Sequence, residues 1–162
     1  MPPKPDPLLP VDDDARATAR QIWKEARTAA LAFTDPVTKT PFISRIGFGT
    51  TSDGAGLTLI SDLAQHTAAL RVTPDCALLL GEPGEKGDPL NSPRLSVRAR
   101  ADFVSAAAPD RAALRDCWLA GHPKARLYVD FPDFHFVRLI PIAAFLNGGF
   151  GRAYALTPDD LD

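Results

Sequence analysis

A short segment near the middle of the chain combines polar side chains that could bind a phosphate group. It leads from an apolar run that ends at Ser61 into a predicted helix whose first turn carries Gln65, His66 and Thr67. Ser61 or Asp62 can cap this helix by accepting a hydrogen bond from a free backbone N–H. Free N–H groups and the positive end of the helix dipole favour an anion at such a helix start. Many helices, however, have polar first turns and bind nothing, and this segment alone favours that second interpretation.

Arg45 supports a phosphate site against the alternative that the start of this helix binds nothing. Residues 42–50 and 57–61 have the pattern of two strands, and the intervening residues 51–56 are typical of a tight turn. If the hairpin is centred on Asp53, antiparallel pairing puts Arg45 opposite Ser61. The planar guanidinium matches the oxygens of a phosphate, although Arg45 could equally be a surface residue at a sheet edge. Gly47 and Gly49 would lie on the same face, where they leave room for a flat ligand or mark a bulge.

No motif of a hydrolase or of a metal enzyme is present in the chain. The three histidines, His66, His122 and His135, lie far apart in sequence, and HExxH, CxxC, GxSxG and Walker patterns are absent. Cys76 and Cys117 have apolar neighbours and no metal-like spacing, so we expect reduced, buried thiols, with a disulfide as the minor alternative. We therefore predict no metal site and name no catalytic residue.

Composition restricts the possible partners of the protein. The chain has 162 residues, with 18 Lys and Arg against 20 Asp and Glu, which is long enough for one domain with a sizeable core. The slightly negative net charge argues against binding to nucleic acid or to an anionic membrane. No run is long and apolar enough to span a membrane, and the first residues lack an apolar signal segment. We therefore expect a soluble, cytoplasmic protein.

The elements that must position these residues are mostly strands. Residues 1–11 are rich in proline and are predicted to form a flexible arm, followed by one domain over residues 12–162. We predict helices over residues 12–33, from residue 62 to Pro74, and from Pro109 to Trp118. Strands are predicted over residues 42–50, 57–61, 76–80, 94–104 and 134–145 and in the tail that ends at Leu156. This order predicts a small barrel of the α+β or mainly β class.

Six short motifs of the chain resemble those of a known family. They are SDLAQHT at 61–67, GDPL at 87–90, PRL at 93–95, HPKA at 122–125, YVDFPDF at 128–134 and GGFGRA at 148–153. In this order they resemble the pyridoxamine 5′-phosphate oxidase-like FMN-binding proteins, and most closely the branch of the HugZ-type haem utilisation proteins. The resemblance covers about residues 42–156.

The resemblance implies a six-stranded antiparallel split β-barrel with peripheral helices. Such a protein would form a homodimer and bind FMN in clefts at the subunit interface. The cofactor-binding residues that it implies are Arg45, Ser61, Gln65, His66 and Thr67 at the FMN phosphate and Arg94 near the flavin ring. The expected function is that of an FMN-dependent oxidoreductase of a small, unknown redox substrate, in which the flavin carries the chemistry. The alternatives are a non-enzymatic flavin- or haem-binding protein and a HugZ-like haem-degrading protein.

The chain departs from the family pattern at two places. His66 and Thr67 stand where the oxidases carry Arg and Lys, so the predicted phosphate site is less positive. The C-terminal substrate-binding Arg and His pattern of the oxidases is not evident, which argues against oxidation of pyridoxine phosphate. Haem-degrading members use a histidine in a C-terminal region, whereas no histidine follows His135 in this chain.

Overall fold

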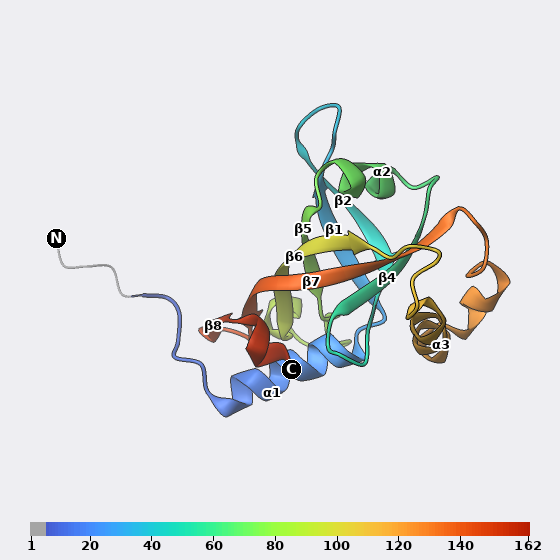
Figure 1. Ribbon diagram of the computed structural model, residues 1–162. Helices are drawn as coiled ribbons and strands as arrows, with labels where there is room; N and C mark the ends of the chain where they lie inside the picture. The colour runs from blue at the N-terminus through green and yellow to red at the C-terminus, as the bar shows by residue number, and fades with distance from the viewer. Residues whose placement is uncertain (1–5) are drawn as a thin grey trace.

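A curled antiparallel β-sheet forms the centre of the computed structural model, which describes residues 6–162 (Figure 1). The strands of this described part are β1 (Thr28–Thr34), β2 (Pro41–Gly47), β3 (Gly49–Thr50), β4 (Gly56–Ser61), β5 (Asp75–Leu80), β6 (Arg94–Phe103), β7 (Phe134–Asn147) and β8 (Ala153–Leu156). They are ordered β2-β1-β5-β6-β7-β4-β3, with β8 paired to β7. The predicted split barrel with peripheral helices is therefore confirmed, with eight strands rather than six.

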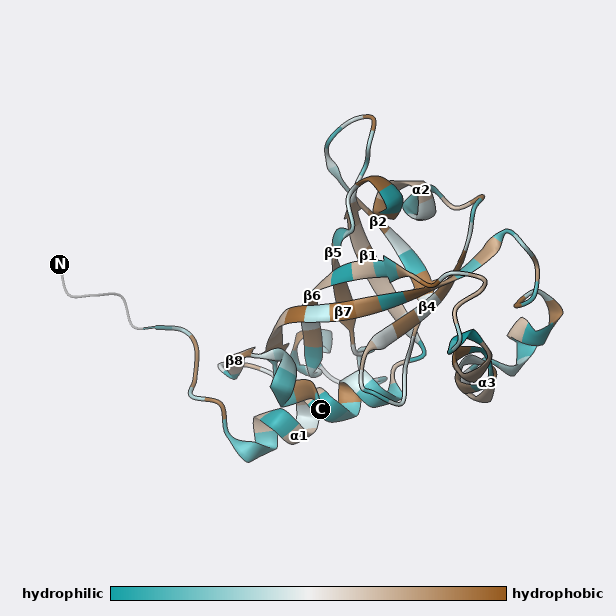
Figure 2. Cartoon of the chain, in the orientation of Figure 1, coloured by the Kyte–Doolittle hydropathy of each residue, from teal (hydrophilic) through white to brown (hydrophobic). Residues whose placement is uncertain are grey.

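The α-helices of residues 6–162 lie around the outside of this sheet (Figure 1). They are α1 (Asp13–Glu25), α2 (Gln65–Val72) and α3 (Arg111–Gly121), and short 3₁₀ turns cover Pro89–Asn91, Pro123–Leu127 and Pro158–Leu161. No helix in residues 6–162 has the length and apolarity that crossing a membrane requires. The mixed colours of α1 in Figure 2 reflect its amphipathic sequence, in which Ala15, Ala19 and Trp23 recur every four residues and are buried.

Burial follows the alternation that the sequence predicts. In β6, Leu95, Val97, Ala99 and Ala101 are buried and the residues between them are mostly exposed. In β4, by contrast, residues on both faces are buried. Ile60 belongs to the core inside the barrel, whereas Leu57 and Leu59 pack with α3 in a second core on the outside. The continuous apolar run before Ser61 thus reflects a strand that is covered on both faces.

The helix predicted over residues 12–33 is wrong beyond Glu25. Residues Thr28–Thr34 form strand β1, in which Ala29, Leu31 and Phe33 are buried at every second position. β1 pairs with β2 on one side and with β5 on the other, so its backbone groups have partners that lie far away in the sequence. These two ladders and the burial outweigh the helix propensity of the alanines.

The predicted pairing of Arg45 with Ser61 is also wrong. The turn is centred on Asp53 as predicted, with Thr50 paired to Gly56 and Gly49 to Leu57. The ladder ends there because the chain leaves it at Phe48, whose buried N–H donates to the carbonyl oxygen of Arg27 at 2.8 Å. Beyond that point β2 pairs with β1, which sets Arg45 opposite Ala30, and Ser61 pairs with Phe134 of β7.

The start of α1 and the residues before it contact the barrel. The side chain of Asp12 accepts a hydrogen bond from the amide of Ala15 at 2.7 Å and so caps α1. The amide of Leu9 donates to the carbonyl oxygen of Ala153 at 2.8 Å, and Val11 packs against the core. Residues 1–5 of the predicted arm lie outside the described residues.

Candidate functional site

The predicted phosphate site corresponds to the region where β4 ends, α2 begins and β2 passes close by. We call this region the α2 corner. Its polar side chains are those of Asp35, Ser44, Ser61, Gln65, His66, Thr67 and Asp133. They come from the β1–β2 turn, β2, β4, the first turn of α2 and the segment before β7.

Most of these side chains bind one another rather than face solvent freely. Thr67 is buried, and its hydroxyl donates to the carbonyl oxygen of Ser61 at 2.6 Å. The Ser61 hydroxyl donates to the Asp133 carboxylate at 3.2 Å. The side-chain amide of Gln65 donates to the Asp35 carboxylate at 2.8 Å. Three of the predicted phosphate donors are therefore already used in fixing the start of α2 on the barrel.

The α2 corner is rich in ionised carboxylates. Hydrogen bonds from the amides of Thr38 and Val37 lower the pKa of Asp35. Next to the corner, Asp62 has a pKa that is lowered chiefly by His135, whose Nε2 lies 2.8 Å from it, and also by Arg71 at 3.5 Å. A phosphate that carries two negative charges would meet repulsion here, because like charges at short range disfavour one another.

His66 is the residue of this corner that could bind a ligand other than a phosphate. Its Nδ1 lies 2.9 Å from the hydroxyl oxygen of Ser44, and its ring packs edge-on against Phe33, with 6.2 Å between the ring centroids. The side chain is half-buried, and this burial lowers the pKa of His66. The imidazole is therefore neutral at pH 7, since an unperturbed histidine already titrates near about 6.5.

Acidification should destabilise the protein through His66. Because the pKa of His66 is lower in the folded state, the unfolded chain takes up a proton first, and stability falls as the pH drops below about 6.5. Asp35 and Asp62 do not contribute in this window, because their pKa values are lowered from 3.8. Urea denaturation at about pH 7.5 and about pH 5.5 should show a larger loss of stability for wild type than for His66→Gln. Equal losses in the two proteins would contradict this role of His66.

The structure does not bring the two predicted arginines into the α2 corner. Arg45 follows Ser44 in β2, and successive side chains of a strand point to opposite faces, so its exposed side chain points away from His66. Arg94 begins β6 opposite Asn147, at the far end of β7 from the Ser61–Phe134 pair. Its guanidinium donates to the carbonyl oxygen of Leu90 at 2.9 Å. Of the predicted site residues, the α2 corner of one chain therefore contains Ser61, Gln65, His66 and Thr67, and not Arg45 or Arg94.

The room beside Gly47 and Gly49 is filled by a side chain of the same protein. A Cβ atom at Gly47 would lie 3.1 Å from two ring carbons of Trp118, and one at Gly49 would lie 3.7 Å from the same ring. The Trp118 ring in turn stacks on His122, with 3.9 Å between their centroids. The flat group that these glycines accommodate is thus the indole of α3.

Two members of the α2 corner were missed by sequence reasoning. Ser44 could have been found from the pattern of β2, in which it lies on the same face as the buried Ile46. Asp35 lies just beyond the helix that the sequence predicted over residues 12–33, and it was not considered as a site residue. No local pattern indicates that its carboxylate meets Gln65, which lies 30 residues later.

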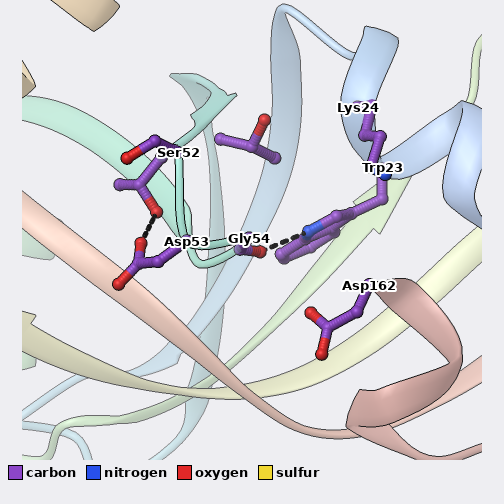
Figure 3. Close-up of a pocket in the computed structure, with 8 residues that line it drawn as sticks. Trp23, Lys24, Ser52, Asp53, Gly54 and Asp162 are labelled. Atoms are coloured by element: carbon purple, nitrogen blue, oxygen red, sulfur yellow. Dashed lines mark hydrogen bonds between the residues drawn. The ribbon is translucent and has the colours of Figure 1, made fainter.

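A cavity of about 550 Å³ lies elsewhere, at the turn between β3 and β4 (Figure 3). Trp23, Lys24, the turn residues 50–54 and Asp162 line it, and the indole N–H of Trp23 donates to the carbonyl oxygen of Gly54. The Thr51 hydroxyl donates to Asp53 within the turn. The bond from Trp23 holds the hairpin on α1, and the bond from Thr51 lies within the turn. Within residues 6–162, no group of three or more His, Cys, Asp or Glu side chains is arranged to hold a metal ion.

Comparison with known proteins agrees with the family resemblance that the motifs indicated. The family model for the CREG β-barrel matches residues 10–161. The chain is 36% identical over 114 residues to the chloroplastic heme oxygenase HOZ of Arabidopsis thaliana, an alignment that covers 70% of this chain and 34% of that protein. This chain therefore spans about a third of the length of the curated relative that it matches.

Solved structures share the fold. A heme binding protein from Mycobacterium smegmatis is 26% identical with a TM-score of 0.82, and the match covers 94% of this chain and 61% of that one. A Clostridium acetobutylicum protein of the pyridoxinephosphate oxidase family is 11% identical with a TM-score of 0.70, covering 94% and 100% of the two chains. The second likeness concerns the fold alone. Together these findings confirm the split-barrel resemblance, in a fold that haem-binding proteins and oxidase-family proteins share.

Proposed function

Because this chain belongs to the CREG β-barrel family, we propose that it is a haem-binding protein. Two of its relatives have names that refer to haem, HOZ of Arabidopsis thaliana and the Mycobacterium smegmatis protein. Both are longer than this chain, so the proposal concerns binding first, and haem degradation is a separate step to be tested.

The observation that carries the proposal is the exposed apolar surface of strand β2 beside the α2 corner. β2 is the first strand in the order of the sheet, so one of its edges lacks a neighbouring strand within residues 6–162. Phe42 and Ile43, on opposite faces of this strand, are 51% and 61% exposed. Haem is a flat, largely apolar macrocycle with two carboxylates, and such ligands bind apolar surfaces that have a few polar groups.

The charges near β2 fit haem better than a phosphate. Arg45 forms no hydrogen bond or ion pair within the described residues and can reach a carboxylate at the rim of a ligand that lies on β2. The carboxylates of the α2 corner, by contrast, repel a phosphate group placed at the start of α2. Bound haem would supply the iron chemistry, while Ile43 and Arg45, which share one face of β2, would hold and orient the macrocycle.

We also propose that the protein is a homodimer. The outer face of the sheet carries small side chains at Ala30, Ala32 and Ala77. The exposed Leu79 pairs with Ala30, and the exposed Phe145 follows on the same face beyond Ser96. A face of this kind lets a second sheet approach closely and buries apolar surface on contact.

An FMN-dependent oxidoreductase is the second candidate. It is favoured by the start of α2, where the amides of Gln65 and His66 lack partners among the described residues and form the positive end of the helix dipole. In that case the flavin would carry the redox chemistry and the phosphate would lie between these amides. This candidate requires the phosphate to tolerate the nearby carboxylates.

Titration of the purified protein with haem, FMN and riboflavin separates the candidates. We expect a Soret band that saturates at a fixed ratio of haem to chain and no quenching of flavin fluorescence at equal concentrations. The reverse result, with FMN bound far more tightly than riboflavin, would replace the proposal with the second candidate. Adding a reductant and oxygen to the haem complex tests degradation through loss of the Soret band. Light scattering of the same samples tests the homodimer, and a monomer would contradict it.

A further inference from the structure

We propose that a second cavity, between the ends of α1 and α3, binds a small organic anion, a carboxylate or phosphate on a short apolar body. This α1–α3 cavity measures about 240 Å³ and is lined by residues of α1, β3, β4 and α3 and by the residues that follow the two helices. Cavities for drug-sized ligands begin at about 300 Å³, so this one suits a smaller metabolite. The proposal does not depend on the haem-binding function.

Two positive side chains line the α1–α3 cavity without a negative one. Lys24 lies in the last turn of α1, and Arg27 follows shortly after the helix ends at Glu25. Neither Lys24 nor Arg27 forms an ion pair within residues 6–162, and no Asp or Glu is among the residues that line the cavity. A cleft lined by one sign of charge attracts ions of the opposite sign. The charge of this cavity therefore favours an anion.

The guanidinium of Arg27 is held in position with one edge free. Its Nη1 donates to the carbonyl oxygens of Lys24, Glu25 and Ala26 at 3.4, 3.2 and 3.3 Å. Its Nε and Nη2 have no hydrogen-bond partner within the described residues. A Cβ atom at Gly121 would lie 3.4 Å from Nε, so the glycine leaves this edge open at the end of α3. Two neighbouring N–H groups of this kind match the oxygens of a carboxylate or phosphate.

Apolar side chains form another wall of the α1–α3 cavity. Leu57 and Trp118 both line it and are themselves buried. The Trp118 ring is fixed by its packing beside Gly47 and Gly49 and by its stacking on His122. An aromatic or aliphatic body attached to the anionic group would contact these side chains, and burial of that body would add to the attraction between charges.

The neighbouring cavity of about 550 Å³ is a poorer site for an anion. It shares Lys24 and Thr50 with the α1–α3 cavity, but the carboxylates of Asp53 and Asp162 also line it (Figure 3). A hydrogen bond from the Thr51 hydroxyl lowers the pKa of Asp53, so this carboxylate is ionised at pH 7. Like charges repel at short range, which disfavours an anion in the larger cavity.

Cys117 provides a chemical reporter for the α1–α3 cavity. The sequence predicted a buried thiol, whereas Cys117 is exposed and lines the cavity, with its Sγ 3.2 Å from the carbonyl oxygen of Thr50. A ligand bound in the cavity would cover this thiol. Burial raises the pKa of Cys76 to about 12, so Cys76 should react far more slowly, because the thiolate is the reactive form.

The test measures alkylation of Cys117 in the full chain by the neutral reagent iodoacetamide, followed by mass spectrometry. We expect benzoate and phenyl phosphate to slow the reaction to a saturating limit, and the uncharged benzamide to leave it unchanged at the same concentrations. Lys24→Gln and Arg27→Gln should each raise the benzoate concentration for half-maximal protection by about 2- to 5-fold, the range for one exposed ion pair.

Lys124→Gln is the matched control for the loss of one positive charge. Lys124 is exposed in the 3₁₀ turn Pro123–Leu127 and lines neither cavity, so its loss should leave protection by benzoate unchanged. Circular dichroism and slow alkylation of Cys76 establish that each variant is folded, and Lys24→Gln decides the test if Arg27→Gln does not fold. Equal protection by benzoate and benzamide, unchanged protection in the folded variants, or no protection by either anion would each overturn the proposal.

Discussion

Replacing Trp23 with alanine should lower the free energy of unfolding by about 3–5 kcal/mol, the usual cost of truncating a buried aromatic side chain. Trp23 lies in the last turns of α1 and is 0% exposed. Its ring packs edge-on against Phe48, with centroids 4.9 Å apart, at the point where the chain passes from β2 to β3. One side chain thus joins α1, the β2–β3 junction and the turn at Gly54.

Urea denaturation followed by circular dichroism measures this effect. Trp23→Phe is the informative second variant, because it keeps an aromatic ring but loses the 2.9 Å hydrogen bond from the indole N–H to the Gly54 carbonyl oxygen. Lys24→Ala is the matched control, since the adjacent exposed residue should change stability by less than about 0.5 kcal/mol. A Trp23→Ala variant as stable as Lys24→Ala would show that α1 does not stabilise the barrel.

Replacing Trp118 with alanine should cost a similar amount, about 3–5 kcal/mol. Trp118 is 4% exposed and fixes α3 on the barrel, where it lies between Gly47, Gly49 and the ring of His122. Its indole N–H, unlike that of Trp23, is buried without a hydrogen-bond partner among the described residues. Trp118→Phe should therefore cost less than Trp23→Phe, because it removes an unsatisfied donor instead of a satisfied one.

Gly47 provides a sharper test of the same contact. In wild type, Gly47→Ala should destabilise by about 1–3 kcal/mol, because the new Cβ atom would press on the Trp118 ring. In the Trp118→Ala background the same substitution should be neutral or stabilising, since it enters the space that the indole has left. Urea denaturation of the four proteins measures the coupling. Equal effects of Gly47→Ala in both backgrounds would contradict the packing described here.

Patterns that depend on neighbouring residues were predicted correctly from the sequence. The strict alternation of β6 predicted its first residue, its end to within one residue and its buried face, because side chains of a strand alternate whatever the partner strand is. The turn centred on Asp53 was likewise predictable, since glycine and aspartate favour such turns through local conformation. The order of short motifs was sufficient to identify the split-barrel family, which the matches with known proteins confirmed.

The tertiary structure decided the features that depend on contacts between distant residues. Residues 28–34 combine alanines that suit a helix with an alternation that suits a strand, and the ladders with β2 and β5 select the strand. The departure of Phe48 from the hairpin determines the register of Arg45, and no local pattern indicates where a ladder ends. The environment of the α2 corner likewise depends on Asp35 and Asp133, which lie 30 and 72 residues from their partners Gln65 and Ser61. The sequence alone determined which hydrogen-bond donors lie in the first turn of α2. Folding determined that carboxylates and Ser44 surround these donors, because electrostatic interactions and hydrogen bonds depend on distance in space.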